Sequence, residues 1–324
     1  MMNALRTTGE PLKTMQQKHL ISLKDYSREE LEEIFDLAAA VKADPAAYGG
    51  VLQGKSLAMI FQKRSTRTRV SFEVGMFQLG GTALHLGPDD IQVRRGETIP
   101  DTARVLSRFV NGIMARVFAH QDVLDLARYG TVPVINGLSD LLHPRQALAD
   151  YFTLRERRGN LEGLKVAYVG DGNNVCHELM FGAVKLGMRM SVGCPEGYEP
   201  NALIVKSATR EAQKLGAPVP VVTADPFAAA EGADIVYTDV WTSMGQEAEA
   251  EARQAAFQGY MVTPEMMAAA TPEAVFMHCL PAHRGEEVAA EVIDGPQSVV
   301  FDEAENRLHV QKALLMLLMS DQTG

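Results

Sequence analysis

A dense run of hydroxyl and guanidinium side chains, Ser65–Arg69, is the feature of this sequence best suited to chemistry. Lys63 and Arg64 precede the run, and an apolar stretch before them, Ser56–Phe61, predicts a buried strand. The residues after Ser65 predict a helix that ends near Leu79. The first N–H groups of a helix have no partners within the helix, and with the helix dipole they attract anions. Because an arginine fork also matches phosphate geometry, we interpret the run as a phosphate site.

The plainer interpretation of Ser65–Arg69 is a capped helix with a solvated basic turn, and neighbouring strand ends argue against it. Arg116 lies near the end of the predicted strand Gly112–Val117, and His143-Pro144-Arg145-Gln146 follows another predicted strand, Val132–Ile135. Alone, the histidine would more simply be structural. Ligands of open α/β sheets bind beside the carboxyl ends of the strands. Three strand ends that carry Arg, His and hydroxyl groups together therefore favour an anion site.

Apolar runs and helical spacings alternate along the chain, which predicts parallel sheets covered by helices on both faces. A capping box, Ser27 with Glu30, starts the first helix, and Ala83–Leu86 adds a strand. Around Arg157–Gly163 the chain turns polar and glycine-bearing, and then the pattern restarts. The second half predicts strands at Lys165–Val169, Met190–Val192, Pro220–Val222, Ile235–Thr238, Val275–His278 and Val299–Phe301, and a last helix over Glu303–Ser320.

We therefore predict an α/β fold with two doubly wound parallel-sheet domains of similar size, linked by helices. The first domain is expected over residues 1–150 and the second over residues 151–302, with a C-terminal helix over residues 303–324. The length of 324 residues agrees, because single hydrophobic cores stop growing at about 250–300 residues.

The bulk composition excludes several function classes. A hydrophobic content of 46% and a charged content of 22% are typical of a soluble globular protein. The net charge of -10 argues against a general affinity for nucleic acid or for an anionic membrane. A local cluster of arginines can still bind a small anion in such a chain. No apolar run approaches the roughly 20 residues of a membrane span.

The cysteines predict a reducing compartment, and we expect a cytoplasmic protein. Cys176, Cys194 and Cys279 are odd in number and widely spaced, without a C-x-x-C pair or a zinc spacing. Met1–Lys18 has three basic residues but no apolar core, so it does not resemble a secretory signal. We expect it to form a tail or a packing arm.

Five ordered motifs resemble the aspartate and ornithine carbamoyltransferase family. Phe61–Arg69 resembles the carbamoyl-phosphate signature of the whole family, and His143–Gln146 resembles its H-P-x-Q element. The others resemble the ornithine enzymes: Asp171–Asn174 a D-G-N-N turn, Asp239–Gly245 a D-x-x-x-S-M-G loop, and His278–Pro281 an H-C-L-P element. The resemblance runs from roughly Lys18 to the C-terminal helix.

The resemblance implies transfer of a carbamoyl group from carbamoyl phosphate to the side-chain amine of L-ornithine, giving L-citrulline and phosphate. It implies no metal and no organic cofactor, one domain for each substrate, and a C-terminal helix that returns to the first domain. It also implies a homo-oligomer, a trimer or a multiple of trimers, with no nucleic-acid or membrane partner. Putrescine and acylated ornithine are the alternative acceptors within the family, and the Ser243-Met244-Gly245 segment favours plain ornithine.

The resemblance also implies a role for each matching residue. Thr68, Arg116 and His143 would donate to the carbonyl oxygen, which gains negative charge in the transition state. The residues implied to bind carbamoyl phosphate are Ser65, Thr66, Arg67, Thr68, Gln92, Arg116, His143, Gln146, Cys279, Leu280 and Arg307. Those implied to bind ornithine are Asn174, Asp239, Ser243 and Met244. Those implied to be catalytic are Arg116, His143, Asp239 and Cys279.

Some of these roles agree with the hydrogen bonds or protons that each chemical group can donate or accept. The carbamoyl NH₂ only donates, so the side-chain oxygen of Gln146 and the backbone carbonyl of Leu280 would accept from it. Gln92 fits a position that reaches into the site of a neighbouring subunit. The ammonium group of ornithine must lose a proton before it attacks, and Asp239 and Cys279 are the candidates for that step.

Arg145 departs from the family pattern. It occupies the variable place of H-P-x-Q, where a small or apolar residue is more usual. Its side chain can point to solvent, add positive potential near the phosphate, or contact a neighbouring subunit. The sequence does not choose among these.

A dinucleotide-dependent oxidoreductase is the alternative from another enzyme class. Gly170-Asp171-Gly172 ends a strand and opens a helix, and Glu196 lies about where a ribose-binding acid would be. However, Val175 replaces the third glycine of that motif, and Asn173 and Asn174 place side chains where pyrophosphate needs bare backbone. We therefore prefer the carbamoyl transfer.

Overall fold

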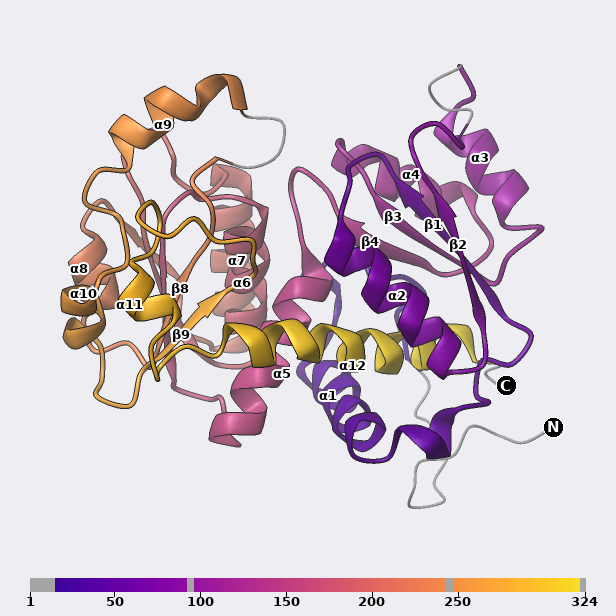
Figure 1. Cartoon of the computed structure of the whole chain (residues 1–324), viewed down its shortest axis with the longest axis horizontal. Coiled ribbons are helices and arrows are strands. Elements are labelled where there is room, and N and C mark those ends of the chain that lie inside the picture. Colours follow the sequence, from indigo (N-terminus) through magenta and orange to yellow (C-terminus); the bar gives the residue numbers. More distant parts are fainter. Residues whose placement is uncertain (1–14, 92–95, 243–246, 321–324) are drawn as a thin grey trace. The chain divides into compact units, whose positions relative to one another are not determined.

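The computed structural model describes residues 15–91, 96–242 and 247–320 (Figure 1). The chain divides into two compact units, of which unit 1 is Met1–Phe152 with Glu305–Gly324 and unit 2 is Thr153–Ala304. Each unit is built on one parallel sheet with helices, so the predicted fold class is confirmed.

The sheet of unit 1 has four parallel strands in the order β2-β1-β3-β4. Their bounds are β1 (Ser56–Phe61), β2 (Thr82–Leu86), β3 (Gly112–Arg116) and β4 (Val134–Leu138). β3 is buried along its whole length and β1 along nearly all of it, which explains their uninterrupted apolar runs. Because the strands are parallel, the segments that follow β1, β3 and β4 leave the same edge of the sheet.

Helices cover both faces of this sheet. Ala103 of α3 (Ile99–Leu106) and Val123 of α4 (His120–Tyr129) share an apolar cluster with Ile60 of β1 and Ile113 of β3. The β1-α2-β2 and β3-α4-β4 connections run in opposite directions across the sheet. Since such crossovers are right-handed, α2 (Thr66–Gln78) lies on the other face (Figure 1).

The remaining helices of unit 1 lie at its N-terminal and C-terminal ends. α1 (Arg28–Ala43) starts at the predicted capping box, in which Ser27 and Glu30 each accept the backbone N–H of the other. Two short 3₁₀ helices, η1 (Leu23–Asp25) and η2 (Pro45–Tyr48), flank it. α5 (Pro144–Arg158) and α12 (Val300–Met319) each have residues in both units, and α12 belongs to unit 1 from Glu305 onward. The C-terminal helix therefore returns to the first unit, as predicted.

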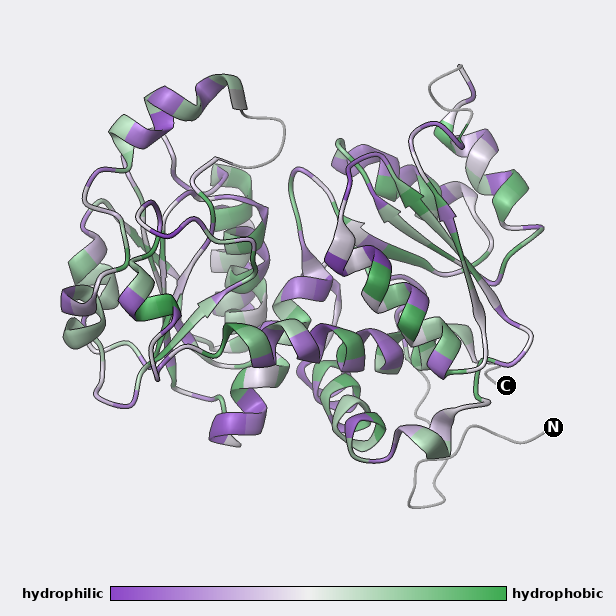
Figure 2. Cartoon of the chain, in the orientation of Figure 1, coloured by the Kyte–Doolittle hydropathy of each residue, from purple (hydrophilic) through white to green (hydrophobic). Residues whose placement is uncertain are grey.

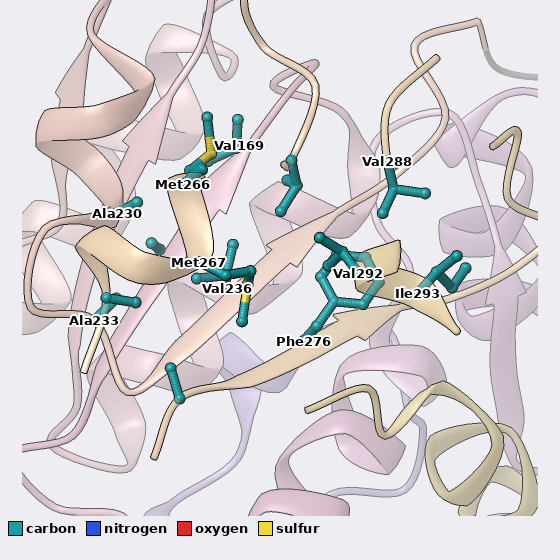
Figure 3. Packing of buried hydrophobic residues seen from close by; sticks show 14 of the residues in the cluster. Val169, Ala230, Ala233, Val236, Met266, Met267, Phe276, Val288, Val292 and Ile293 are labelled. Carbon is teal, nitrogen blue, oxygen red and sulfur yellow. The ribbon is translucent and has the colours of Figure 1, made fainter. Parts of the chain in front are cut away.

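Unit 2 has five parallel strands in the order β7-β6-β5-β8-β9. The strands are β5 (Lys165–Val169), β6 (Arg189–Gly193), β7 (Val221–Thr223), β8 (Ile235–Thr238) and β9 (Val275–His278). The helices are α6 (Asn174–Lys185), α7 (Ala202–Leu215), α8 (Pro226–Ala230), α9 (Ala250–Ala256), α10 (Pro264–Ala269) and α11 (Ala290–Ile293), with a 3₁₀ helix η4 (Glu247–Glu249). Figure 3 shows Val236 of β8 and Phe276 of β9 in the core of this unit, beside Met267 of α10 and Val292 of α11.

The hydropathy of the elements follows this layering. The strands are mainly hydrophobic, whereas the helices alternate between hydrophobic and hydrophilic residues (Figure 2). Among the described helices, none combines the length and the apolar character required to cross a membrane.

The structure corrects two local predictions. The predicted strand Val299–Phe301 is wrong, because only Ser298 bridges to Phe276 before α12 begins at Val300. A short apolar run does not distinguish a strand from the start of a buried helix. The predicted strand Val132–Ile135 is displaced, because β4 runs over Val134–Leu138 and so includes Gly137. A Cβ on this glycine would meet the Met114 sulfur at 2.4 Å, so close packing on β3 explains the glycine.

Candidate active site

The first turn of α2 presents hydroxyl groups at the carboxyl end of β1. Ser65 caps the helix: its Oγ accepts the N–H of Thr68 at 3.3 Å and lies 2.8 Å from Thr68 Oγ1. Thr68 is buried, whereas Thr66 and Arg67 are exposed on the same turn. This turn therefore combines helix N–H groups, hydroxyls and an exposed guanidinium, which is a suitable arrangement for binding an anion.

Two buried guanidinium groups of unit 1 donate to the hydroxyl of Thr68. Arg145 Nη2 lies 2.5 Å from Thr68 Oγ1, and Arg307 Nη2 lies 3.3 Å from the same atom. Arg116, the last residue of β3, is also buried. Phe61 and Arg116 are paired in the sheet, so this arginine leaves the sheet beside the segment that leads to α2. Positive charge therefore gathers at one edge of the unit 1 sheet.

His143 lies in this positive environment and is neutral. Burial lowers the pKa of His143 well below its ordinary value of 6.5, and the guanidinium groups of Arg145, Arg116 and Arg307 lower it further. A neutral imidazole donates from one nitrogen only. His143 can therefore act as a hydrogen-bond donor to a ligand oxygen without being charged.

Gln146 is oriented by Asp150, one helical turn along α5. The Gln146 Nε2 donates to Asp150 Oδ1 at 2.8 Å, and both side chains are fully buried. A carboxylate only accepts, so it must face the NH₂ end of the amide. The oxygen of the Gln146 amide, which accepts hydrogen bonds, is therefore the end turned away from Asp150.

In unit 2, Asp239 follows β8 and accepts from three donors. Asn173 Nδ2 lies 2.7 Å from Asp239 Oδ2, while the Val240 N–H at 2.9 Å and Cys279 Sγ at 3.1 Å reach Oδ1. Thr238 and His278 are paired at the ends of β8 and β9. The register thus places the carboxylate and the thiol side by side.

Asn173 serves both this carboxylate and a helix. Its Oδ1 accepts the N–H groups of Val175 and Cys176 and so caps α6. Asn174 is the next residue and the first of the helix, and it is half-buried. The D-G-N-N turn therefore provides one residue that holds Asp239 and one at the helix start.

His278 and Glu287 shape the turn that carries Leu280. Leu280 has a φ of +56°, which is uncommon outside glycine, and its N–H donates to His278 Nδ1 at 2.8 Å. Since Nδ1 accepts, the ring proton is on Nε2, which lies 3.2 Å from Glu287 Oε1. The same carboxylate oxygen accepts the N–H of His283 at 2.5 Å. Neither His278 nor Glu287 has an exposed side chain.

Metal ligation would compete with these hydrogen bonds. The ligand atoms of Asp239, His278 and Cys279 lie within 4.8 Å of one another, as do those of His283, Glu286 and Glu287. Both ring nitrogens of His278 already take part in hydrogen bonds, to Leu280 and Glu287. A metal at the first cluster that used the histidine would have to break one of them.

The structure describes the positions of most of the predicted site residues. Gln92, Ser243 and Met244 lie outside the described residues. Within unit 1, Thr68 is in contact with both Ser65 and Arg307. The charges of Arg116 and Arg307 also lower the pKa of His143. Asp239 and Cys279 are in contact within unit 2, with Leu280 next in the chain.

Three positioning residues were missed by the sequence analysis. Asn173 was interpreted only as part of a turn, although a side chain able to cap at the start of a helix was a usable signal. Glu287 is a loop carboxylate, and no spacing marks it. Arg253 of α9 donates to Asp171 Oδ2 and to the Trp241 carbonyl, each at 3.0 Å. That contact joins segments far apart in the sequence.

The D-G-N-N turn is not shaped for a pyrophosphate. A Cβ on Gly172 would lie 2.2 Å from the backbone nitrogen of Pro200. The bare backbone of this glycine therefore serves close packing within unit 2. This removes the main feature that favoured a dinucleotide site.

Comparison with known proteins agrees with the geometry. The model of the aspartate/ornithine carbamoyltransferase carbamoyl-P binding domain matches residues 18–156, and that of the Asp/Orn binding domain matches residues 162–318. The chain belongs to this family. It is 60% identical over 311 residues to the ornithine carbamoyltransferase of Symbiobacterium thermophilum, covering 95% of this chain and 99% of that protein.

Comparisons with Pyrococcus furiosus extend the family comparison to a solved structure. The chain is 56% identical over 304 residues to its anabolic ornithine carbamoyltransferase, covering 93% of this chain and 96% of the relative. The solved structure of an ornithine carbamoyltransferase from this organism superposes with a TM-score of 0.90 at 56% identity, covering 94% and 98% of the two chains. Membership of the family therefore rests on both sequence and fold.

Proposed function

We propose that the chain transfers the carbamoyl group of carbamoyl phosphate to the side-chain amine of L-ornithine, giving L-citrulline and phosphate. The observation that carries the proposal is the presence of two complementary half-sites. Unit 1 has a neutral histidine and several guanidinium groups around Thr68, and unit 2 has a carboxylate, Asp239, bonded to a thiol, Cys279. The first set suits an anionic carbonyl donor, and the second suits an amine.

Carbamoyl phosphate is assigned to unit 1, which we take as the first domain. Arg67 and Arg307, with the hydroxyls and N–H groups of Ser65–Thr68, hold the phosphate. Thr68, Arg116 and His143 donate to the carbonyl oxygen as the amine attacks, and this stabilises the developing charge. The side-chain oxygen of Gln146 and the Leu280 carbonyl accept hydrogen bonds from the NH₂ of carbamoyl phosphate. Cys279 is the last residue that the family pattern assigns to this substrate.

Ornithine is assigned to unit 2. Its side-chain ammonium loses a proton, and we assign that step to Asp239 and Cys279, which are hydrogen-bonded to each other. The amine then forms the new C–N bond, the C–O bond to phosphate breaks, and the phosphate leaves with the second proton that the nitrogen loses. Asn174 and the N–H of Met244 bind the α-carboxylate, while Asp239 and Ser243 bind the α-ammonium.

An acceptor panel tests this function directly. We expect citrulline formation from ornithine to exceed carbamoylation of putrescine, N-acylated ornithine and aspartate, because the Ser243-Met244 segment is that of the ornithine enzymes. Faster carbamoylation of putrescine or aspartate would overturn the assignment of the acceptor. We also propose that no metal or cofactor takes part, so extensive dialysis against a chelator should leave the rate unchanged.

The oligomeric state, the cellular location and the direction of the reaction belong to the same proposal. We infer a cytoplasmic enzyme of the anabolic direction, as the Pyrococcus furiosus relative is named, assembled as a trimer or a multiple of trimers. Light scattering should give a mass that is a multiple of three chains. Gln92 is assigned to a neighbouring subunit's site, so mixed Gln92→Ala and Arg67→Ala subunits should regain activity that neither variant has alone. Mixtures that stay inactive would contradict shared sites.

A further inference from the structure

Arg145 is a charged residue of the H-P-x-Q element, and the proposed function leaves it without a role. It is the second residue of α5, and its side chain is only 1% exposed, so the solvent alternative left open by the sequence is wrong. Its Nε donates to the Gly137 carbonyl of β4 at 2.8 Å, and its Nη2 donates to Thr68 Oγ1 at 2.5 Å. These two contacts tie the end of β4 to the first turn of α2.

The contact with Thr68 decides what that hydroxyl can do. A hydroxyl oxygen has two lone pairs and one proton. Arg145 and Arg307 both donate to Thr68 Oγ1, at 2.5 and 3.3 Å. Two guanidinium donors fill both lone pairs, so the hydroxyl has only its proton left to share. The hydroxyls of Ser65 and Thr68 lie 2.8 Å apart, and either can donate to the other. With two guanidinium donors on Thr68 Oγ1, the Thr68 proton is the one that remains for Ser65 Oγ or for a bound ligand.

We propose that Arg145 is a positioning residue of the carbamoyl-phosphate half-site, which together with Arg307 commits the Thr68 hydroxyl to donate its proton to the substrate. The inference rests on the proposed function, because that function assigns Thr68 to the phosphate and carbonyl oxygens. A hydroxyl free to rotate would present a lone pair to these oxygens part of the time. A hydroxyl held as a donor is preorganised for charge that develops in the transition state.

The charge of Arg145 supports the same role. Among the guanidinium groups that lower the pKa of His143, that of Arg145 has the largest effect, after burial. The residue thus keeps two donors of the half-site in the required state, one hydroxyl and one neutral imidazole. The contact with Thr68 and this share of the pKa shift both require a guanidinium at this place, and a small or apolar residue would provide neither.

The test uses Arg145→Met, which keeps the length of the side chain and removes its donors and charge. We expect kcat/KM for carbamoyl phosphate to fall roughly 10- to 100-fold, as for other residues that orient a site residue. KM for ornithine should change less than about twofold, and the Kd of inorganic phosphate, by calorimetry, should rise by about tenfold. Arg157→Met, an exposed arginine on the same helix that pairs with Asp302, is the matched control and should leave all three values unchanged.

A double-mutant cycle with Thr68→Val separates positioning from packing. If Arg145 acts through the Thr68 hydroxyl, Arg145→Met should cost less than about twofold in the Thr68→Val background. Equal losses in both backgrounds would overturn the proposal, as would a lower Tm with unchanged kinetics. If Arg145→Met does not fold, Arg145→Gln, which keeps one donor without the charge, takes its place in the same cycle.

The proposed function and this inference can fail separately. A wild-type enzyme that makes no citrulline would overturn the function. The phosphate Kd of the Arg145 variants would still show whether Arg145 orders the anion site. Citrulline formation with an unchanged phosphate Kd and unchanged kinetics in Arg145→Met would overturn the inference alone.

Discussion

Cys279 Sγ donates to Oδ1 of Asp239 over 3.1 Å, and this contact joins the carboxyl ends of β9 and β8. Replacing the carboxylate should remove the proton acceptor that we assign to the ornithine ammonium. We expect Asp239→Asn to lower kcat by about 10²- to 10⁴-fold, the usual contribution of a general base. Citrulline formation under saturating substrates measures the effect. A kcat within threefold of wild type would contradict the role of Asp239.

The thiol of this pair can be tested with a matched cysteine. Cys279→Ser keeps a donor to Asp239 and should be milder than Cys279→Ala, which removes it. Cys194, in the same unit, is buried, and burial raises its thiol pKa to about 12, so it is inert at neutral pH. Cys194→Ala should therefore leave kcat unchanged. Equal losses for the two alanine variants would indicate packing effects.

The exposed arginines of the first turn of α2 should behave differently from each other. Arg67 is assigned to the phosphate, whereas Arg69 Nε pairs with Glu73 Oε1 at 2.9 Å on the helix surface. Arg67→Ala should lower kcat by about 10²- to 10³-fold while the protein still folds, because the contacts to the phosphate are lost. Arg69→Ala should cost less than threefold. Near wild-type turnover of Arg67→Ala would refute the phosphate assignment.

The buried pair of His278 and Glu287 should make stability depend on pH. Burial alone would raise the pKa of Glu287, but hydrogen bonds from His278 and from the His283 backbone outweigh it and lower the pKa below the ordinary 4.5. The ionised form is thus favoured by folding, so its contribution is present above pH 4.5 and is lost as the pH falls through the lowered value. Glu287→Gln should reduce the free energy of unfolding by about 1–2 kcal/mol at pH 7.

Urea unfolding across pH 3 to 8 measures this dependence. The difference between wild type and Glu287→Gln should shrink as the solution becomes more acidic, since protonated glutamate resembles glutamine. Glu286→Gln, at the exposed neighbour, is the control and should show no difference at any pH. A constant difference for Glu287→Gln would contradict the assignment of an ionised carboxylate.

The neutral state of His143 should be visible in the pH profile of kcat/KM for carbamoyl phosphate. Its pKa lies well below 6.5 because of burial and three neighbouring guanidinium groups. The imidazole stays unprotonated as the pH falls through 6.5, so His143 should cause no acid limb there. In Arg145→Met one of these groups is removed, and a limb should move up toward 6.5. A wild-type limb at 6.5 that disappears in His143→Gln would prove the prediction wrong.

Most of the strands were predictable because they are short and largely buried. Runs such as Ser56–Phe61 and Val275–His278 are apolar without alternation, and they match the observed β1 and β9. Errors arose where an apolar run had another cause. Val299 and Val300 are buried at the start of a helix, and Gly137 is needed for packing in β4. A local pattern of apolar residues indicates that a segment is buried, but it does not indicate which other element packs against that segment.

Only those residues of the candidate site that lie within sequence motifs could be predicted. Thr68 and Asp239 lie within recognisable runs, and their chemistry follows from their residue types. Arg253 donates to Asp171, 82 residues away in the sequence, and no spacing encodes such a contact. Glu287 lies only nine residues from His278, but it lies in a loop, where no regular spacing marks the contact. Arg145 was noticed because it departs from its motif, but its role depends on the distance to Thr68, which only the structure provides.

The cap of α6 has a consequence for how this sequence can change. Serine, threonine, aspartate and asparagine ordinarily replace one another at the start of a helix with little loss. Asn173 also donates to Asp239 Oδ2 at 2.7 Å, and none of the other three residues has an NH₂ to offer there. Aspartate would place two carboxylates in contact. A helix cap usually tolerates exchange among these four residues, but at this position the contact with Asp239 favours asparagine. We therefore expect substitutions of Asn173 to be rarer among active relatives than its capping role alone would suggest.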